Sequence, residues 1–199
     1  MWIAVQFFRG SSKELVSWID AKLKEYNVPK EHFAFDATGV GYYLTSYTNG
    51  IPITPNRRVI QEVDEYGNAV TLEECFNMRS QLTYKMKVML EKGDIACSLD
   101  KNMVIPYGKN GQTRRLIDVL YDEINVFTFT SKNKKIYARS KDEYKAKYKS
   151  SPNLMDALVY SAIFHLDARP KKQPLPQIPD DAYNGLGRYF SGSEKKIYI

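Results

Sequence analysis

The chain carries the sequence FAFDATGVG at residues 33–41. The apolar residues Phe33 to Phe35 predict a short buried strand that ends at Asp36, and the glycines that follow predict a tight turn. The apolar run WIAVQFF at residues 2–8 predicts an earlier strand. Because a helix is expected between the two strands, this opening favours a crossover between parallel strands and an α/β layer.

The helix between these strands is expected to begin after Ser11. Ser11 and Glu14 have the spacing of a capping box, which satisfies the first N–H groups of a helix. The apolar positions that follow recur at helical spacing as far as about Tyr26: Leu15, Trp18, Ile19 and Leu23.

Three further helices are expected. Asn77 and Gly93 are typical first and last residues of one helix. A second is expected over residues 112–124, and a third opens with Ser151 as its cap and Pro152 at its first position. The expected apolar faces are Met78, Leu82, Met86, Met89 and Leu90 in the first helix, Leu116, Val119, Leu120 and Ile124 in the second, and Met155, Leu158, Val159, Ala162, Ile163 and Leu166 in the third.

Strands are expected in the segments between these helices. Residues 49–74 are rich in turn-forming residues and include an expected surface hairpin at residues 61–70. A further strand is expected at residues 95–99. Residues 126–130 and 135–139 alternate as two strands that residues 131–134 join.

The composition changes after Ala168. Four prolines lie between residues 170 and 179, and three glycines follow between residues 185 and 192. Such a segment should lack a core of its own. With 199 residues in all, we expect one domain over residues 1–168 and a Pro/Gly-rich tail over residues 169–199.

Positive charge is concentrated in the second half of the chain. The net charge is +6; residues 1–100 carry 11 Lys/Arg against 13 Asp/Glu, and residues 101–199 carry 18 against 10. The densest stretch, residues 132–149, also contains Tyr137, Tyr144 and Tyr148. Interleaved cations and aromatics suit a polyanion such as nucleic acid, and a solvated hairpin and loop is the alternative.

Several classes of protein are excluded. No apolar run of 18 residues and no signal-peptide layout is present, so neither membrane insertion nor export is expected. Cys75 and Cys97 lack metal-ligand spacing and read as thiols in a reducing cytoplasm. No phosphate-binding GxxxxGK[ST] motif occurs, and His32 and His165 are expected to be structural.

Two carboxylates have positions that suit a hard cation. Asp36 follows a predicted core strand, where open α/β sheets bind ligands. Asp156 lies in the second turn of the last helix, and Asn153, three residues earlier, lies on the same side. Carboxylate and amide oxygens bind Mg²⁺ and Mn²⁺, which assist phosphodiester cleavage. The alternatives are a turn residue bonded to its own backbone for Asp36 and helix-dipole stabilisation for Asp156.

Four segments resemble, in their order and spacing, the nuclease domain of the large terminase subunit of tailed bacteriophages. They are residues 35–41, 77–95, 141–149 and 151–158. Over residues 1–168, the resemblance implies an RNase H-like α/β fold, with a mixed central sheet flanked by helices. It also implies metal-dependent endonucleolytic cutting of concatemeric viral DNA during genome packaging.

The resemblance also implies roles for single residues. Asp36 and Asp156 would be catalytic residues that bind Mg²⁺ or Mn²⁺, with Asn153 as an auxiliary ligand. Double-stranded DNA would be held by Arg139, Lys141, Lys145 and Lys147. The portal protein, the terminase ATPase domain and the small subunit would be partners, and the site of action would be the procapsid packaging vertex in the host bacterial cytoplasm.

The chain also departs from this family. A first strand that bears another metal-binding Asp has no counterpart, so the sequence resembles an N-terminally truncated nuclease domain, expected to cleave DNA feebly or not at all by itself. The first alternative is a catalytically incomplete module that binds DNA or docks on the portal through its tail. The second is a resolvase or another nuclease of the RNase H-like superfamily.

Overall fold

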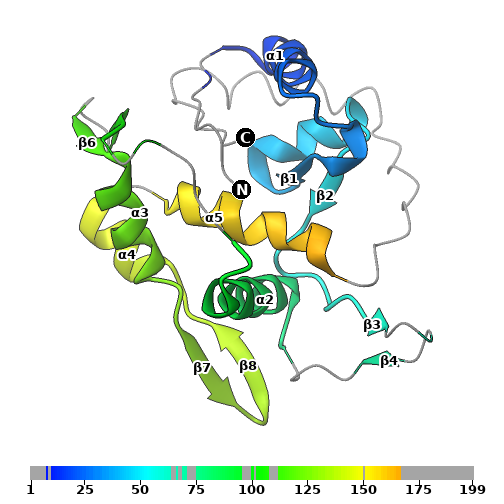
Figure 1. Ribbon diagram of the computed structural model, residues 1–199, viewed down its shortest axis with the longest axis vertical. Helices are drawn as coiled ribbons and strands as arrows, with labels where there is room; N and C mark the ends of the chain where they lie inside the picture. Colours follow the sequence, from blue (N-terminus) through cyan, green and yellow to red (C-terminus); the bar gives the residue numbers. More distant parts are fainter. Residues whose placement is uncertain are drawn as a thin grey trace. The chain divides into compact units, whose positions relative to one another are not determined.

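The structure is a computed structural model that describes residues 8, 10–63, 66, 69–70, 75–95, 100, 102–107, 112–149 and 151–166. The predicted strands at residues 2–8 and 95–99 lie outside the described residues, apart from Phe8 and Ile95, and so does the tail at 169–199. The described part is mixed α/β, with small sheets and several helices (Figure 1), which confirms the α/β class.

The chain divides into two compact units, and each is described by itself. Among the described residues, the N-terminal unit holds residues 8 to 54 and the central unit holds residues 55 to 166. No helix in the described part of the chain is long and apolar enough to cross a membrane.

The N-terminal unit is built around helix α1, Ser12–Glu25. The predicted capping box is confirmed: the Glu14 N–H donates to Ser11 Oγ at 3.3 Å, and the Ser11 N–H donates to Glu14 Oε2 at 2.6 Å. The Ser11 N–H holds the pKa of Glu14 below its ordinary value. One face of α1 completes an apolar core that consists of Phe8, Leu15, Ile19, Leu23, Phe33, Phe35 and Leu44.

A parallel strand pair follows α1 and a short 3₁₀ helix, η1 (Lys30–His32). Strand β1 (Ala34–Asp36) pairs with β2 (Ile51–Ile53), and the 3₁₀ helix η2 (Gly39–Ser46) makes the connection. The strand that ends at Asp36 is therefore confirmed. Strand β2 was not foreseen because Pro52 lacks the N–H that a central strand needs, although an edge strand tolerates it.

Gly41 lies where no side chain fits. A Cβ atom built on Gly41 would lie 1.6 Å from the carbonyl oxygen of Asp36. The Gly41 N–H also donates to the carbonyl of Thr38 at 3.1 Å, which closes the turn after β1. The backbone path from β1 into η2 therefore requires glycine at this position.

Three helices form the core of the central unit. Helix α2 (Met78–Lys92) packs against α5 (Asn153–Ser161) and against its continuation, the 3₁₀ helix η3 (Ala162–His165), and helix α3 (Leu116–Ile124) packs against α5. The predicted ends of α2 are confirmed, with Asn77 as N-cap and Gly93 in the left-handed conformation. The buried apolar residues include Met78, Leu82, Met86, Met89, Leu116, Val119, Leu154, Met155, Leu158, Val159, Ala162, Ile163 and Leu166, whereas Leu90 and Ile124 are exposed.

Strands β3 (Glu62–Val63) and β4 (Ala69–Val70) form the predicted antiparallel hairpin. The helix predicted from residue 112 begins only at Leu116, because β6 (Thr113–Arg115) pairs with β5 (Val104–Pro106). A partner strand that begins nine residues earlier thus overrides the local helical pattern.

A hairpin follows α3 as predicted, but its first strand lies at residues 129–132 and not at 126–130, so the turn has two residues and not the predicted four. Strands β7 (Phe129–Lys132) and β8 (Lys135–Ala138) are antiparallel, with a two-residue turn at Asn133 and Lys134, and helix α4 (Asp142–Tyr148) follows them. In Figure 1 the hairpin extends beyond helix α2 of the same unit.

Candidate functional site

Asp36 lies in the N-terminal unit, exposed at the end of β1. Its Oδ1 accepts hydrogen bonds from the Thr38 N–H at 2.9 Å and from Thr38 Oγ1 at 2.6 Å. Asp36 thus makes the hydrogen bonds of a turn residue, which is the alternative role that the sequence analysis gave it. Because Asp36 and Asp156 belong to different units, a site that they share stays a prediction.

Asp156 lies in the first turn of α5 and not in the second as predicted, because the helix begins at Asn153. Both carboxylate oxygens of Asp156 accept hydrogen bonds from Lys141 Nζ. The side chains of Lys141 and Asp156 are only 16% and 18% exposed. The structure thus brings together a predicted metal ligand and a predicted DNA-binding lysine as a largely buried ion pair.

Glu123 is a site residue that the sequence interpretation missed. It projects from α3 with 1% exposure, and its Oε2 accepts the N–H of Met155 at 2.8 Å. The predicted Ser151 cap is wrong: Pro152 is the N-cap and makes no side-chain cap bond. Glu123 instead reaches across from α3 and satisfies one of the free N–H groups at the start of α5.

Burial raises the pKa of Glu123 to about 8, and the negative charge of Asp156 also raises it, whereas the Met155 N–H opposes the shift. Glu123 therefore holds its proton over much of the neutral range. Beside it, the hydroxyls of Tyr107 and Tyr144 share a hydrogen bond, and burial raises the pKa of both phenols. The Tyr144 hydroxyl lies 3.5 Å from Glu123 Oε1, at the limit of hydrogen bonding.

The sequence did contain a signal for Glu123. It follows Leu116, Val119 and Leu120 at intervals of three or four residues, so it shares their helix face. Assigning Ile124 to that face was wrong, because Ile124 is 38% exposed and Glu123 is buried. A carboxylate on an apolar stripe indicates a buried polar contact.

The carboxylates of Asp156 and Glu123 do not by themselves make a two-ion metal site in the central unit. The ammonium of Lys141 contacts both oxygens of Asp156, and Glu123 is buried with a raised pKa. Among the residues that the structure describes, no group of three His, Cys, Asp or Glu side chains could hold a metal ion. Asp156 and Asn153 remain the predicted ligands in this unit.

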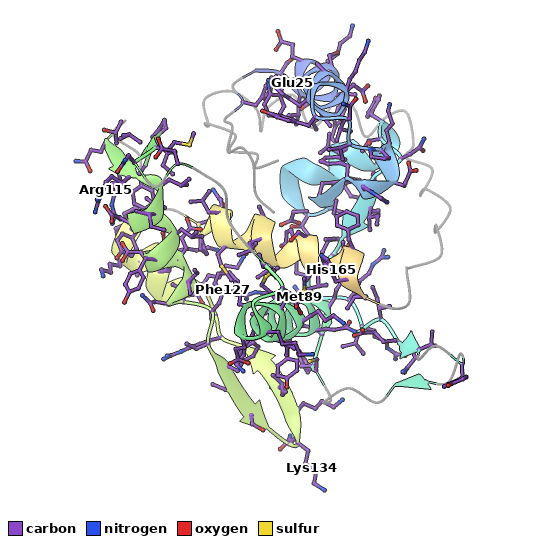
Figure 2. The ribbon with its side chains drawn as sticks, viewed as in Figure 1. Glu25, Met89, Arg115, Phe127, Lys134 and His165 are labelled. Atoms are coloured by element: carbon purple, nitrogen blue, oxygen red, sulfur yellow. The ribbon has the colours of Figure 1, made fainter. Side chains whose placement is uncertain are left out.

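The second feature of this unit is the basic ribbon, which we define as β7, β8, their turn and Arg139. Lys132 lies directly opposite Lys135 in the strand register. Asn133 and Lys134 form the turn with φ angles of 52° and 60°, and Lys134 lies at the tip (Figure 2). The ribbon thus gathers three lysines within four residues, at its most exposed end.

Of the predicted DNA-binding residues, Arg139 belongs to this ribbon, and the three lysines lie at the start of α4 or within it. Arg139 is exposed, and its N–H extends the pairing by donating to the carbonyl of Thr128 at 2.8 Å. Lys145 and Lys147 are exposed on α4, where Lys147 Nζ lies 4.7 Å from the ring centre of Tyr148. The ammonium of Lys141 is paired with Asp156.

Comparisons with protein families, with curated proteins and with solved structures found no match to this chain. The chemistry proposed below therefore depends on the residues and on their geometry. Two features carry it: the ion pair and buried carboxyl at the start of α5, and the lysines of the basic ribbon.

Proposed function

We propose that the chain binds DNA through the basic ribbon and the adjacent cations of α4. The observation that carries this proposal is the arrangement of Lys132, Lys134 and Lys135 at the hairpin tip. Like charges directly opposite each other across two strands destabilise a hairpin by about 0.2–1 kcal/mol. The phosphates of a polyanion would remove this repulsion and release counterions.

The backbone of Lys134 supports the same proposal. With φ at 60°, Lys134 occupies a position where two-residue hairpin turns favour glycine. A side chain in this left-handed conformation costs about 1 kcal/mol. Lysine at this point therefore weakens the turn while it places a cation at the tip, which is what a phosphate contact needs.

The expected binding is independent of base sequence, because contacts to phosphate carry no sequence information. The terminase resemblance implies double-stranded DNA as a partner, and phosphate contacts of this kind are available on single strands as well. If three or four cations contact phosphates, the logarithm of affinity should fall with the logarithm of salt concentration with a slope of about −3 to −4.

The variant Lys134→Gly tests this proposal because stability and binding should change in opposite directions. Relief of the strained turn should raise the free energy of unfolding by about 0.5–1 kcal/mol. Loss of the cation should weaken duplex binding and make the salt slope shallower by about one. Urea unfolding and fluorescence anisotropy at several salt concentrations measure the two effects.

The matched control is Lys24→Gln, which removes an exposed cation from α1 of the N-terminal unit. It should leave the salt slope within error of the wild type. An unchanged duplex affinity and slope in Lys134→Gly would contradict the proposed use of the ribbon.

We propose metal-dependent endonuclease activity as a second candidate, with the RNase H-like fold and the role in phage DNA packaging that the terminase resemblance implies. The observation that favours it is the buried Glu123 near the Lys141–Asp156 ion pair, since a carboxyl whose pKa is strongly raised, as that of Glu123 is, is typical of functional sites. Divalent ions would supply the activated water and the charge needed at the leaving oxygen. Asp36, Asp156 and Asn153 are the ligands that the resemblance implies.

Plasmid nicking in Mg²⁺ or Mn²⁺ tests this second candidate. We expect feeble cleavage that Asp36→Asn and Asp156→Asn each abolish, whereas the control Asp142→Asn, which removes a carboxylate at the start of α4, retains it. Cleavage that survives Asp156→Asn would contradict the nuclease site. No cleavage with either metal, together with DNA binding, would leave the chain as a binding module.

A further inference from the structure

Two aromatic rings stack beside the basic ribbon. Cys75 forms a parallel bridge with Ile136, and the N–H of Phe76 donates to the Ile136 carbonyl at 2.9 Å, so residues 75–76 extend the ribbon beyond β8. The ring centres of Phe76 and Tyr137 are 4.4 Å apart, and their planes differ by 23°. Phe76 is nevertheless 53% exposed.

The strand register separates the two faces of the ribbon. Phe129 lies on the face that contacts α2, since its ring meets that of Tyr84 edge-on at 5.9 Å. Tyr137 pairs with Thr130 and so lies on the other face, the one that also carries Lys132 and Lys135. The stacked pair therefore shares the outer face of the ribbon with the opposed lysines.

This combination suits a nucleotide better than a protein core. A half-exposed phenylalanine leaves one face of a flat π-system open, and a nucleobase covers such a face whatever its identity. In a duplex the base faces are already stacked on their neighbours, so only an unpaired base is available for this contact. Lys135 lies two residues from Tyr137 on the same face and can contact the phosphate of the stacked nucleotide.

We propose that Phe76, backed by Tyr137, stacks an unpaired base, and that the basic ribbon thereby prefers single-stranded DNA to duplex. This inference rests on the proposed DNA-binding function and names the form of DNA that the same surface selects. Lys132, Lys135 and Arg139 hold the backbone of the strand, and the aromatic pair holds a base without reading its sequence.

The experiment measures fluorescence anisotropy of the full chain with labelled oligothymidylate and with a duplex of equal length. The variant Phe76→Leu keeps apolar volume and removes the ring, and Phe76→Trp keeps a ring. Loss of one base stack corresponds to roughly a 5- to 150-fold weaker affinity. We expect Phe76→Leu to weaken oligothymidylate binding by about tenfold and duplex binding by less than about twofold.

Phe76→Trp should retain the affinity of the wild type, and oligothymidylate should quench the added tryptophan fluorescence. Equal affinity of wild type and Phe76→Leu for oligothymidylate, with duplex binding intact, would overturn this inference and leave the proposed function standing. Equal weakening on both DNAs would also overturn it, since the ring would then serve only to support the ribbon. Failure of the wild type to bind either DNA would refute the proposed function itself.

Discussion

Replacing Glu123 by glutamine removes a titrating group from the central unit and keeps its shape. Glu123 is 1% exposed, and its Oε2 accepts the Met155 N–H at 2.8 Å. The amide oxygen of glutamine can accept the same hydrogen bond. Glu123→Gln therefore isolates the effect of ionisation at this position on the free energy of unfolding.

The expected magnitude follows from the pKa of Glu123, which burial raises from 4.5 to about 8. Between these values the folded protein keeps a proton that the unfolded chain releases, so stability falls as pH rises. The stabilising contribution is complete below about pH 4.5 and is lost as pH rises through about 8. Since one pKa unit corresponds to about 1.4 kcal/mol, the wild type should lose about 2–3 kcal/mol relative to Glu123→Gln between about pH 6 and pH 9.

Urea unfolding followed by circular dichroism, at intervals across this pH range, measures the difference. The control is Glu91→Gln on α2, where the side chain of Glu91 is 61% exposed; its difference from wild type should barely change with pH. The reasoning would be refuted if the difference in free energy of unfolding between the wild type and Glu123→Gln stayed constant across the range. Such a result would show that Glu123 titrates in the folded protein as it does in the unfolded chain.

Two other substitutions test single interactions. Ser11→Ala removes the side-chain half of the capping box of α1 and should cost about 1 kcal/mol in urea unfolding, and a value near zero would show that the cap adds nothing to stability. Lys141→Met leaves the carboxylate of Asp156 largely buried without its ammonium partner and should destabilise the protein by about 1–3 kcal/mol. The double variant Lys141→Met/Asp156→Leu should recover part of this loss. The coupling would be contradicted if the double variant lost as much stability as Lys141→Met and Asp156→Leu lose in sum as single variants.

The sequence predicted those elements that short-range chemistry determines. Ser11 and Glu14 cap α1, and Asn77 and Gly93 bound α2, because each of these groups bonds within its own helix end or adopts the backbone that the end requires. The β7–β8 hairpin likewise follows from alternation around a polar turn.

The sequence did not predict features that depend on a distant partner. Residues 113–115 form a strand because residues 104–106 lie beside them, and residues 51–53 form one because β1 offers an edge. The helical start of α5 depends on Glu123, which comes from another helix. The ion pair of Lys141 with Asp156 could not be foreseen either, since it needs the residue before α4 to lie beside the first turn of α5.

Gly41 limits how the N-terminal unit can diverge. A Cβ atom there would nearly coincide with the Asp36 carbonyl oxygen, at 1.6 Å. A homologue could replace the carboxylate of Asp36 and lose only its chemistry, whereas replacing the glycine would reroute the main chain. Searches for remote homologues should therefore give more weight to a glycine five residues after a short apolar strand than to the acid at its end.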